Sequence, residues 1–381
     1  MLVGVVYLDF SAAFDILDHT LLTEKLKFYG FNSSALKWIE SYLSFRSQKV
    51  YLNGSLSSRR SLECGVPQGS CLGPLLFSIF TNDLARATKS AKTVLYADDT
   101  TLTVLYADDT TLYYTAPSCG ELNQVLSREL NVVYDWVVSN KLALNISKTK
   151  CMVIGSRHKL SASPKLDLKF CDLMVQQVES AKLLGVMVDC SLSWSHHINY
   201  IIVKMGRAIS SARKCCSFVA RPLLCQIVHS LVLCHLDYCS TVWTSAARGY
   251  LKKLQVVQNK AARLVLGCHI RSNVNQMHSC LSWLTVENKL LFNTLILFKS
   301  VMSSNVPAFI HSQIVYSNSV HDHKTRGSCN GQLVLPGPKT NALKRSFIYR
   351  SLHLWNNLPH YIRYTDSKLS FKKNLRLHLM P

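Results

Sequence analysis

The order of apolar and polar positions divides the chain into two parts. Over residues 1–190, short apolar runs alternate with segments of helical spacing. The run GVVYLDF (4–10) predicts a buried strand, and residues 119–142 predict a long amphipathic helix. This alternation predicts an α+β fold built on a small sheet. Beyond Trp194 the apolar residues recur mainly at helical spacing, so the sequence predicts a change to a helical region there.

Turn and cap residues refine these elements. Residues 21–31 and 34–46 have helical spacing, with Gly30 as the C-cap and Asn32 as the N-cap between them. The pair Asn53-Gly54 predicts a hairpin turn. The runs CMVIGS (151–156) and LLGVMVD (183–189) each predict one short strand. Residues 306–345 are rich in Ser, Asn, Gly and Pro and predict an extended linker. The expected divisions are therefore 1–194, 195–305, 306–345 and the short helices of 346–381.

One decamer occurs twice in succession. TVLYADDTTL occupies residues 93–102 and again residues 103–112. Each copy predicts an apolar strand, a double-aspartate turn and a Thr-rich return strand, so the pair predicts a meander with strands 93–97, 100–107 and 110–114. Successive turns of a meander lie at opposite ends of the sheet, roughly 26 Å apart at about 3.3 Å per residue. Only one of the two Asp-Asp turns can then face a given site.

The charge balance indicates the kind of partner. Lys and Arg number 43 against 22 acids, a net charge of +21, while 48% of the residues are hydrophobic. This excess favours a polyanion, with nucleic acid first and an acidic membrane surface second. A soluble protein that is merely basic is the alternative. Residues 2–8 are apolar but too short for a signal sequence or a membrane span, so we expect no membrane insertion.

The 14 cysteines are scattered and include no C-x-x-C pair. A zinc site can be imagined from Cys234, His235, Cys239, Cys268 and His269, but these residues lack the spacing of zinc motifs. We expect free thiols in a reducing compartment, with no disulfide partner and an intracellular location.

Three segments carry candidate chemistry. Asp9 ends a buried strand, where an acid either binds something or simply emerges into solvent. The segment GVPQGSCLGPLLF (65–77) predicts a stiff loop that allows close backbone approach, although it also suits an ordinary connection. The adjacent aspartates of YADD repel one another, and a metal ion relieves that repulsion. A solvated turn is the alternative for YADD alone.

In this order the three segments resemble the palm of a reverse transcriptase. Their detailed sequences resemble the reverse transcriptases of non-LTR retrotransposons (LINE or jockey-like). LDFSAAFD (8–15) resembles motif A, residues 65–77 motif B and YADD motif C. LALNISKTKCMVIG resembles motif D and AKLLGVMVDCSLSW motif E. The resemblance implies a right-hand-type polymerase palm followed by a helical thumb. Because the chain begins eight residues before Asp9, we expect it to lack most of the fingers.

The resemblance also implies an activity, its cofactors and its partners. We expect an RNA-directed DNA polymerase that uses two Mg²⁺ ions, with Mn²⁺ as the other possible ion. Its partners would be an RNA template, a DNA primer or duplex and dNTP, in the nucleus and cytoplasm. The implied metal ligands and catalytic groups are Asp9 with Asp108 and Asp109, or with Asp98 and Asp99, and Lys148. The implied substrate contacts are Phe14, Gln68, Gly69, Tyr96 and Tyr106, and the primer grip is Leu184 and Gly185.

Two alternatives stay open at this point. The distance from Gly65 to Tyr96 suits copy one, whereas copy two keeps the native exit into the long helix. We favour Asp108 and Asp109, because the polar segment 85–92 can absorb an insertion upstream of copy two. Lys148 is either a proton donor or a solvated lysine. The alternative to an active polymerase is a truncated remnant that only binds nucleic acid.

Overall fold

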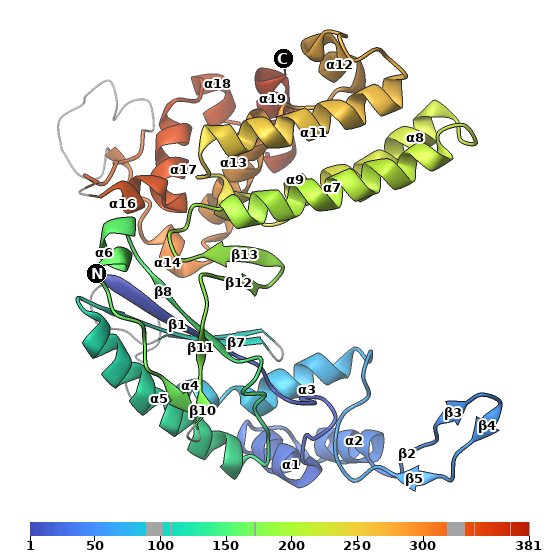
Figure 1. Cartoon of the computed structure of the whole chain (residues 1–381), viewed down its shortest axis with the longest axis vertical. Helices are drawn as coiled ribbons and strands as arrows, with labels where there is room; N and C mark the ends of the chain where they lie inside the picture. Colours follow the sequence, from blue (N-terminus) through green and yellow to red (C-terminus); the bar gives the residue numbers. More distant parts are fainter. Residues whose placement is uncertain are drawn as a thin grey trace. The chain divides into compact units, whose positions relative to one another are not determined.

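The computed structural model describes residues 1–88, 102–106, 109–170, 173–317, 332–338, 340–365 and 367–380. The contacts divide the chain into two compact units. The first comprises residues 1–185 and 189–192, and the second comprises residues 186–188 and 193–381. The described residues form small sheets and many helices (Figure 1), which confirms the prediction of a mixed α and β fold.

A five-stranded sheet lies at the centre of the first unit. β1 (Leu2–Leu8) is its central strand, and it is antiparallel to β7 (Asp109–Ala116) on one side and to β8 (Lys150–Ile154) on the other. The strand order is β11-β8-β1-β7-β6, with β6 at Leu102–Tyr106 and β11 at Gln176–Gln177. Val6 is fully buried, as the apolar run predicts.

Helices complete the core of this unit. The helix α5 (Cys119–Ser139) packs on β1 and β7 through a stripe of fully buried leucines that includes Leu122 and Leu126. A Cβ on Gly4 would lie 2.6 Å from Leu126 Cδ1, so the small residue lets α5 approach β1 closely. The other helices are α1 (His19–Phe28), α2 (Ser33–Leu43), α3 (Leu72–Thr81), α4 (Leu84–Ala87) and α6 (Arg157–Ser161).

The predicted N-cap and hairpin are confirmed, whereas the C-cap of α1 is Tyr29 and the predicted C-cap Gly30 is the next residue. The Asn32 side chain accepts a hydrogen bond from the Ala35 amide and caps α2, and Gly30 has φ of 87° after α1. Asn53 and Gly54 both have positive φ, as a two-residue turn of type I′ requires. They join β3 (Tyr51–Leu52) to β4 (Ser55–Leu56), and β2 (Ser47–Gln48) pairs with β5 (Arg60–Ser61) below them.

The prediction of one strand over 183–189 is wrong. β12 ends at Leu183 and β13 (Val186–Asp189) begins after a two-residue turn at Leu184 and Gly185, whose φ values are 45° and 82°. Gly185 alone signals a turn, but a leucine at positive φ has no counterpart in the sequence pattern. β12 begins at Ser180, and the short strands β9 (Lys169–Phe170) and β10 (Leu173–Met174) precede it.

The longer elements of the second unit are all helices. Its first core contains α7 (Ser195–Cys215), α8 (Arg221–Val228) and α11 (Arg248–Leu266) around the fully buried Trp243. A π-helical turn, η1 (His229–Leu233), follows α8. The second core packs α13 (Val286–Ser304) against α17 and α19. The remaining helices are α9 (Cys234–Asp237), α10 (Ser240–Trp243), α12 (Val274–Leu281), α14 (Ala308–His311), α16 (Asn341–Arg345), α17 (Phe347–Asn356), α18 (His360–Arg363) and α19 (Lys368–Leu379).

Beyond residue 194 the sequence predicts three separate regions, but the structure groups them into one unit. Leu333, from the expected linker, is buried in the core that α13 and α17 form, and it bridges to Tyr316. Residues 318–331 and 339 of that linker lie outside the described residues. The difference arises because α13 packs against α9, α10 and α11 as well as against the C-terminal helices α17 and α19, and local composition does not show such contacts.

Candidate active site

Asp9 follows the last residue of β1 at one end of the central sheet. Its side chain is 41% exposed, and Lys148 Nζ lies 3.7 Å from Asp9 Oδ2. The Asp9 carbonyl accepts a hydrogen bond of 2.7 Å from the Asn145 amide, and Phe10 bridges to Leu144. The strand end is therefore bonded to the segment that carries Lys148.

A side-chain turn presents Lys148 beside Asp9. The Asn145 side-chain oxygen accepts hydrogen bonds from Ser147 Oγ at 2.7 Å and from the Lys148 amide at 3.3 Å. Lys148 is 69% exposed, so its ion pair with Asp9 is screened by water and contributes little to stability. The lysine is accessible, and its ammonium group stays near the carboxylate.

The strand register brings copy two of the decamer to Asp9. Leu8 pairs with Thr110, so Asp9 and Asp109 are the next residues on two adjacent antiparallel strands. Within the hairpin β6–β7, Tyr106 pairs with Asp109. The backbones of Asp9, Tyr106 and Asp109 therefore lie at the same end of the sheet.

Gly65 joins the loop of residues 64–70 to the segment after Asp9. Its amide donates to the Leu17 carbonyl at 2.7 Å, and its carbonyl accepts from His19 Nε2 at 2.8 Å and from Arg46 Nη1 at 3.0 Å. Its φ is +81°, and a Cβ there would lie 2.5 Å from the Asp15 carbonyl oxygen. Only glycine fits this position without moving the backbone.

Gln68 is held by an acid for which the sequence assigned no role. Gln68 Nε2 lies 2.9 Å from each carboxylate oxygen of Asp15. Asp15 is the second acid of LDFSAAFD, and that spacing was the available signal. Gly69 follows with φ of +79°, and nothing lies within 4 Å of the position a Cβ would take. The loop thus offers an oriented amide beside open backbone.

Comparison with known proteins agrees with this arrangement. Residues 3–188 match the family model described as reverse transcriptase (RNA-dependent DNA polymerase). Residues 3–188 belong to the reverse transcriptase family. The resemblance inferred from the three motifs is therefore confirmed.

The relatives of this reverse transcriptase domain come from mobile elements. A probable RNA-directed DNA polymerase from transposon BS of Drosophila melanogaster is 28% identical over 310 residues, covering 76% of this chain and 32% of that protein. The RNA-directed DNA polymerase from mobile element jockey of Drosophila funebris is 29% identical, covering 69% of this chain and 28% of that protein. The chain spans about a third of the length of these curated relatives.

Among solved structures, the apo telomerase from Candida tropicalis aligns with a TM-score of 0.38 and 10% identity, over 80% of this chain and 52% of that chain.

The residues that follow each decamer explain why copy two lies in the sheet of the reverse transcriptase domain. Copy two is followed by YYTA (113–116) and copy one by TVLY (103–106). Ala116 is fully buried opposite Leu2, and Tyr114 is 8% exposed with its hydroxyl donating to Glu121 at 3.3 Å. In the same register, copy one would bring Tyr106 to the place of Ala116, and overfilling a packed core costs about 1–3 kcal/mol.

Several predicted site residues are not tested by the side-chain geometry. Asp98, Asp99, Asp108 and Tyr96 lie outside the described residues, and only the backbone is described for Asp109 and Tyr106. Leu184 and Gly185 form the turn between β12 and β13. The ring of Phe14 is half-buried, 5.3 Å from the Phe77 ring of α3. The functional roles of these residues stay predictions.

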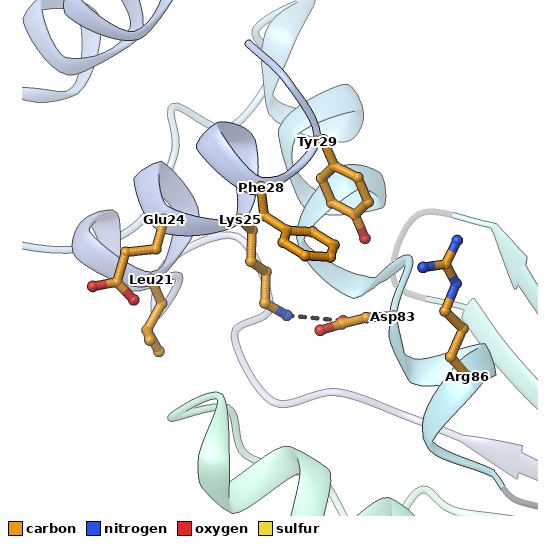
Figure 2. A pocket seen from close by; sticks show the side chains of 7 residues that line it. All are labelled: Leu21, Glu24, Lys25, Phe28, Tyr29, Asp83 and Arg86. Carbon is orange, nitrogen blue, oxygen red and sulfur yellow. Dashed lines mark hydrogen bonds and ion pairs between the residues drawn. The ribbon is translucent and has the colours of Figure 1, made fainter.

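A pocket of about 290 Å³ lies elsewhere on the reverse transcriptase domain. Figure 2 shows Lys25 reaching Asp83, and Lys25 Nζ donates to Asp83 Oδ1 at 2.8 Å and to the Phe80 carbonyl at 2.7 Å. Burial lowers the pKa of Lys25, while Asp83 opposes that change. None of the predicted site residues whose side chains the structure describes lines this pocket, whose lining comprises Leu21, Glu24, Lys25, Phe28, Tyr29, Asp83 and Arg86.

Three further findings bear on metals, thiols and membranes. Among the residues that the structure describes, no group of three or more His, Cys, Asp or Glu side chains is arranged to hold a metal ion. The twelve described cysteines are free thiols. Within the same part of the chain, no helix combines the length and the apolar character needed to cross a bilayer.

Proposed function

We propose that the chain is the polymerase of a non-LTR retrotransposon, which adds dNTP to a primer 3′-hydroxyl on an RNA template. The observation that carries the proposal is the register of β1 and β7, which places Asp9 and Asp109 at the same end of the sheet. We further propose that the first unit is a right-hand-type palm and that the helices of the second unit form a thumb.

The donor set suits divalent metal ions. Asp9 presents a half-exposed carboxylate whose neighbouring cation is the exposed Lys148 ammonium, and a bound metal ion would replace that ammonium as the counter-charge of the acid. Carboxylate oxygens are the ligands that Mg²⁺ prefers. Asp9, Asp108 and Asp109 would hold two Mg²⁺ or Mn²⁺ ions. Bound there, the ions would lower the pKa of the primer hydroxyl and neutralise charge on the triphosphate and the leaving pyrophosphate.

The chain's own side chains supply orientation and proton transfer in this proposal. Asp15 fixes the amide of Gln68, so Gln68 can contact the new base pair in one orientation, and Gly69 leaves room for the template backbone. Phe14, braced by Phe77, would limit space at the sugar of the incoming nucleotide. Lys148 would donate a proton to the departing pyrophosphate.

The second unit has the charge pattern of a duplex-binding surface. Between residues 190 and 286 the only acid is Asp237, whereas basic residues recur along α7 and α11. Those exposed on the two helices include Lys204, Arg207, Arg213, Lys214, Lys252, Lys253 and Lys260. Such cations bind phosphates without sequence preference, so we propose the primer–template duplex as their partner.

A primer-extension assay on the purified chain tests the function. With Mg²⁺, dNTP and a primed RNA template, we expect extension that Asp9→Ala lowers at least about 10³-fold, as removal of a key electrostatic group does. Extension that is equal in the parent and in Asp9→Ala would refute the proposal. Binding of the template without extension by the parent would instead favour the inactive nucleic-acid binder.

The same assay separates the two decamers. We expect Asp108→Asn to abolish extension and Mn²⁺ binding, and Asp98→Asn to leave both unchanged. The reverse pattern would assign the metal site to copy one.

A location in the nucleus and cytoplasm is also proposed, and cell fractionation with an antibody to the chain would test it.

A further inference from the structure

A hairpin arm, defined as residues 47–61, extends from the first unit in Figure 1. Every residue from 48 to 61 is exposed. Four of them are large and apolar, with Val50 and Leu56 64% exposed and Tyr51 and Leu52 69% exposed. Single exposed apolar residues are ordinary, but four within seven positions on one arm indicate a binding surface.

The arm is an ordered ladder. Tyr51 pairs with Leu56 across the type I′ turn, and the Ser57 amide donates to the Val50 carbonyl at 2.9 Å. Nearer the base, Arg59 Nε donates to Ser47 Oγ at 2.7 Å. Directly opposite residues share a face, so Tyr51 and Leu56 form one apolar face and Leu52 lies on the other.

The charges of the arm all have one sign. Residues 41–62 contain no acid, and the cations Arg46, Lys49, Arg59 and Arg60 accompany the apolar positions. Among the described residues, no acid lies within ion-pair distance of Lys49, Arg59 or Arg60. An exposed aromatic ring beside unpaired cations is the combination with which proteins bind single-stranded nucleic acid.

We propose that the hairpin arm binds single-stranded RNA, namely the template before it reaches the polymerase site. The Tyr51 ring stacks on a base, and Lys49 and Arg60 contact neighbouring phosphates. The inference rests on the proposed function for the identity of the strand. The charge complementarity selects this occupant over a protein partner, whose docking is an alternative outcome of the test.

The base of the arm is bonded to the candidate active site. Arg46 immediately precedes the arm, and its guanidinium donates to the Gly65 carbonyl at 3.0 Å. The Leu62 amide donates to the Arg46 carbonyl at 2.9 Å. Gly65 precedes Gln68 in the loop beside Asp15, so a strand bound along the arm leads toward the residues proposed to contact the template.

Fluorescence anisotropy with a labelled single-stranded RNA of about 30 nucleotides tests the proposal on the full chain. We expect Tyr51→Ala to weaken binding about tenfold, as loss of one stacked base does. In the double variant Lys49→Gln/Arg60→Gln, the slope of log K against the logarithm of salt concentration should be shallower by about 1.4. Each lost phosphate contact contributes about 0.7 to this slope.

Tyr361→Ala is the matched control, because Tyr361 is 62% exposed in the second unit. Circular dichroism should show all variants folded. Arm variants that bind as tightly as the parent, or a Tyr361→Ala variant that loses as much affinity, would overturn the proposal. The proposal would also be overturned if the arm variants changed oligomeric state, as measured by light scattering, without a change in RNA binding. If the parent chain shows no primer extension but its RNA binding still depends on the arm, only the proposed polymerase function is refuted.

Discussion

Among the described residues, the first unit pairs four of its acids with cations, whereas the second unit presents many cations and few acids. Four of the five ion pairs among the described residues lie in the first unit, including Lys25–Asp83 and Lys148–Asp9. In the second unit, Asp237 is the only acid over 190–286, and it already pairs with Lys289 at 2.7 Å. The first unit therefore neutralises several of its cations with its own acids, and the second leaves more positive charge available to a polyanion.

The units also differ in their buried histidines, because the second unit buries His197 and His278, whereas neither described histidine of the first unit, His19 or His158, is buried. In the first unit, backbone atoms of separate loops are joined through Gly65 and Asp9. In the second, the buried polar side chains are mostly neutral, such as Gln258, whose amide donates to the Leu284 carbonyl at 2.9 Å, and His278, which is fully buried. We therefore expect the first unit to be sensitive to backbone changes and the second to protonation.

Gly65→Ala should have the largest effect on stability. A Cβ would meet the Asp15 carbonyl at 2.5 Å and the residue would be held at positive φ, so we expect a loss of about 3 kcal/mol in the free energy of unfolding. Gly69→Ala is the control, because its φ is similar but its surroundings are open, and about 1 kcal/mol is expected. Urea denaturation measures both, and equal losses would contradict the close packing of the two loops.

Acid should destabilise the second unit through His197. This side chain is 2% exposed, and burial lowers its pKa to about 4, while Nδ1 accepts a hydrogen bond from the Met187 amide at 3.2 Å. The neutral ring stabilises the folded state above the unfolded pKa of about 6.5, and that contribution is lost as the pH falls toward 4. We expect a loss of about 2 kcal/mol between pH 7 and pH 5.

Denaturation at several pH values measures this effect. His197→Gln should reduce the pH dependence and leave a remainder from His278 and His235, whose pKa values burial also lowers. His196→Gln, on the exposed side of α7, should retain all of it. An unchanged pH profile in His197→Gln would show that another group is responsible.

Lys25→Met should cost less, about 1 kcal/mol. The change removes hydrogen bonds to Phe80 and Asp83, but Asp83 is 38% exposed and water can replace its partner. Lys27→Met, exposed on the same helix, should be neutral. Thermal unfolding compares the two, and equal melting temperatures would show that the buried ammonium contributes nothing.

Lys148→Gln should have the smallest effect on stability, below about 0.5 kcal/mol, because its ion pair is exposed. If Lys148 donates a proton in the reaction, the rate of extension should nevertheless fall about 10²-fold. Lys141→Gln removes a similarly exposed pair, with Asp18, and should leave the rate unchanged. Equal rates of extension in the two variants would show that Lys148 is a solvated lysine without a role in proton transfer.

The sequence predicted the local elements well because their signals are local. Asn32 caps a helix through its own side chain, and Asn53-Gly54 can occupy positive φ with little strain, so both features follow from residue type. Leu184 shows the limit, because a leucine adopts positive φ only when its surroundings require it. The central strand β1 was also predictable, since a run of apolar residues has to be covered on both faces.

The contacts that assemble the candidate site were not predictable in the same way. Asp15 and Gln68 are 53 positions apart, and nothing in either segment specifies the other. The hydrogen bond from Arg46 to Gly65 likewise depends on how two loops meet. Motif order indicated which segments converge, but the pairing of individual atoms follows from tertiary packing.

The repeated decamer has a consequence for the gene. Because residues 93–102 and 103–112 are identical, loss of either copy yields the same shorter chain. That chain would keep YYTA after its single decamer, and with it the side chains that pair β7 with β1. A deletion in the gene that removes either copy would therefore leave the strand that borders Asp9 unaltered.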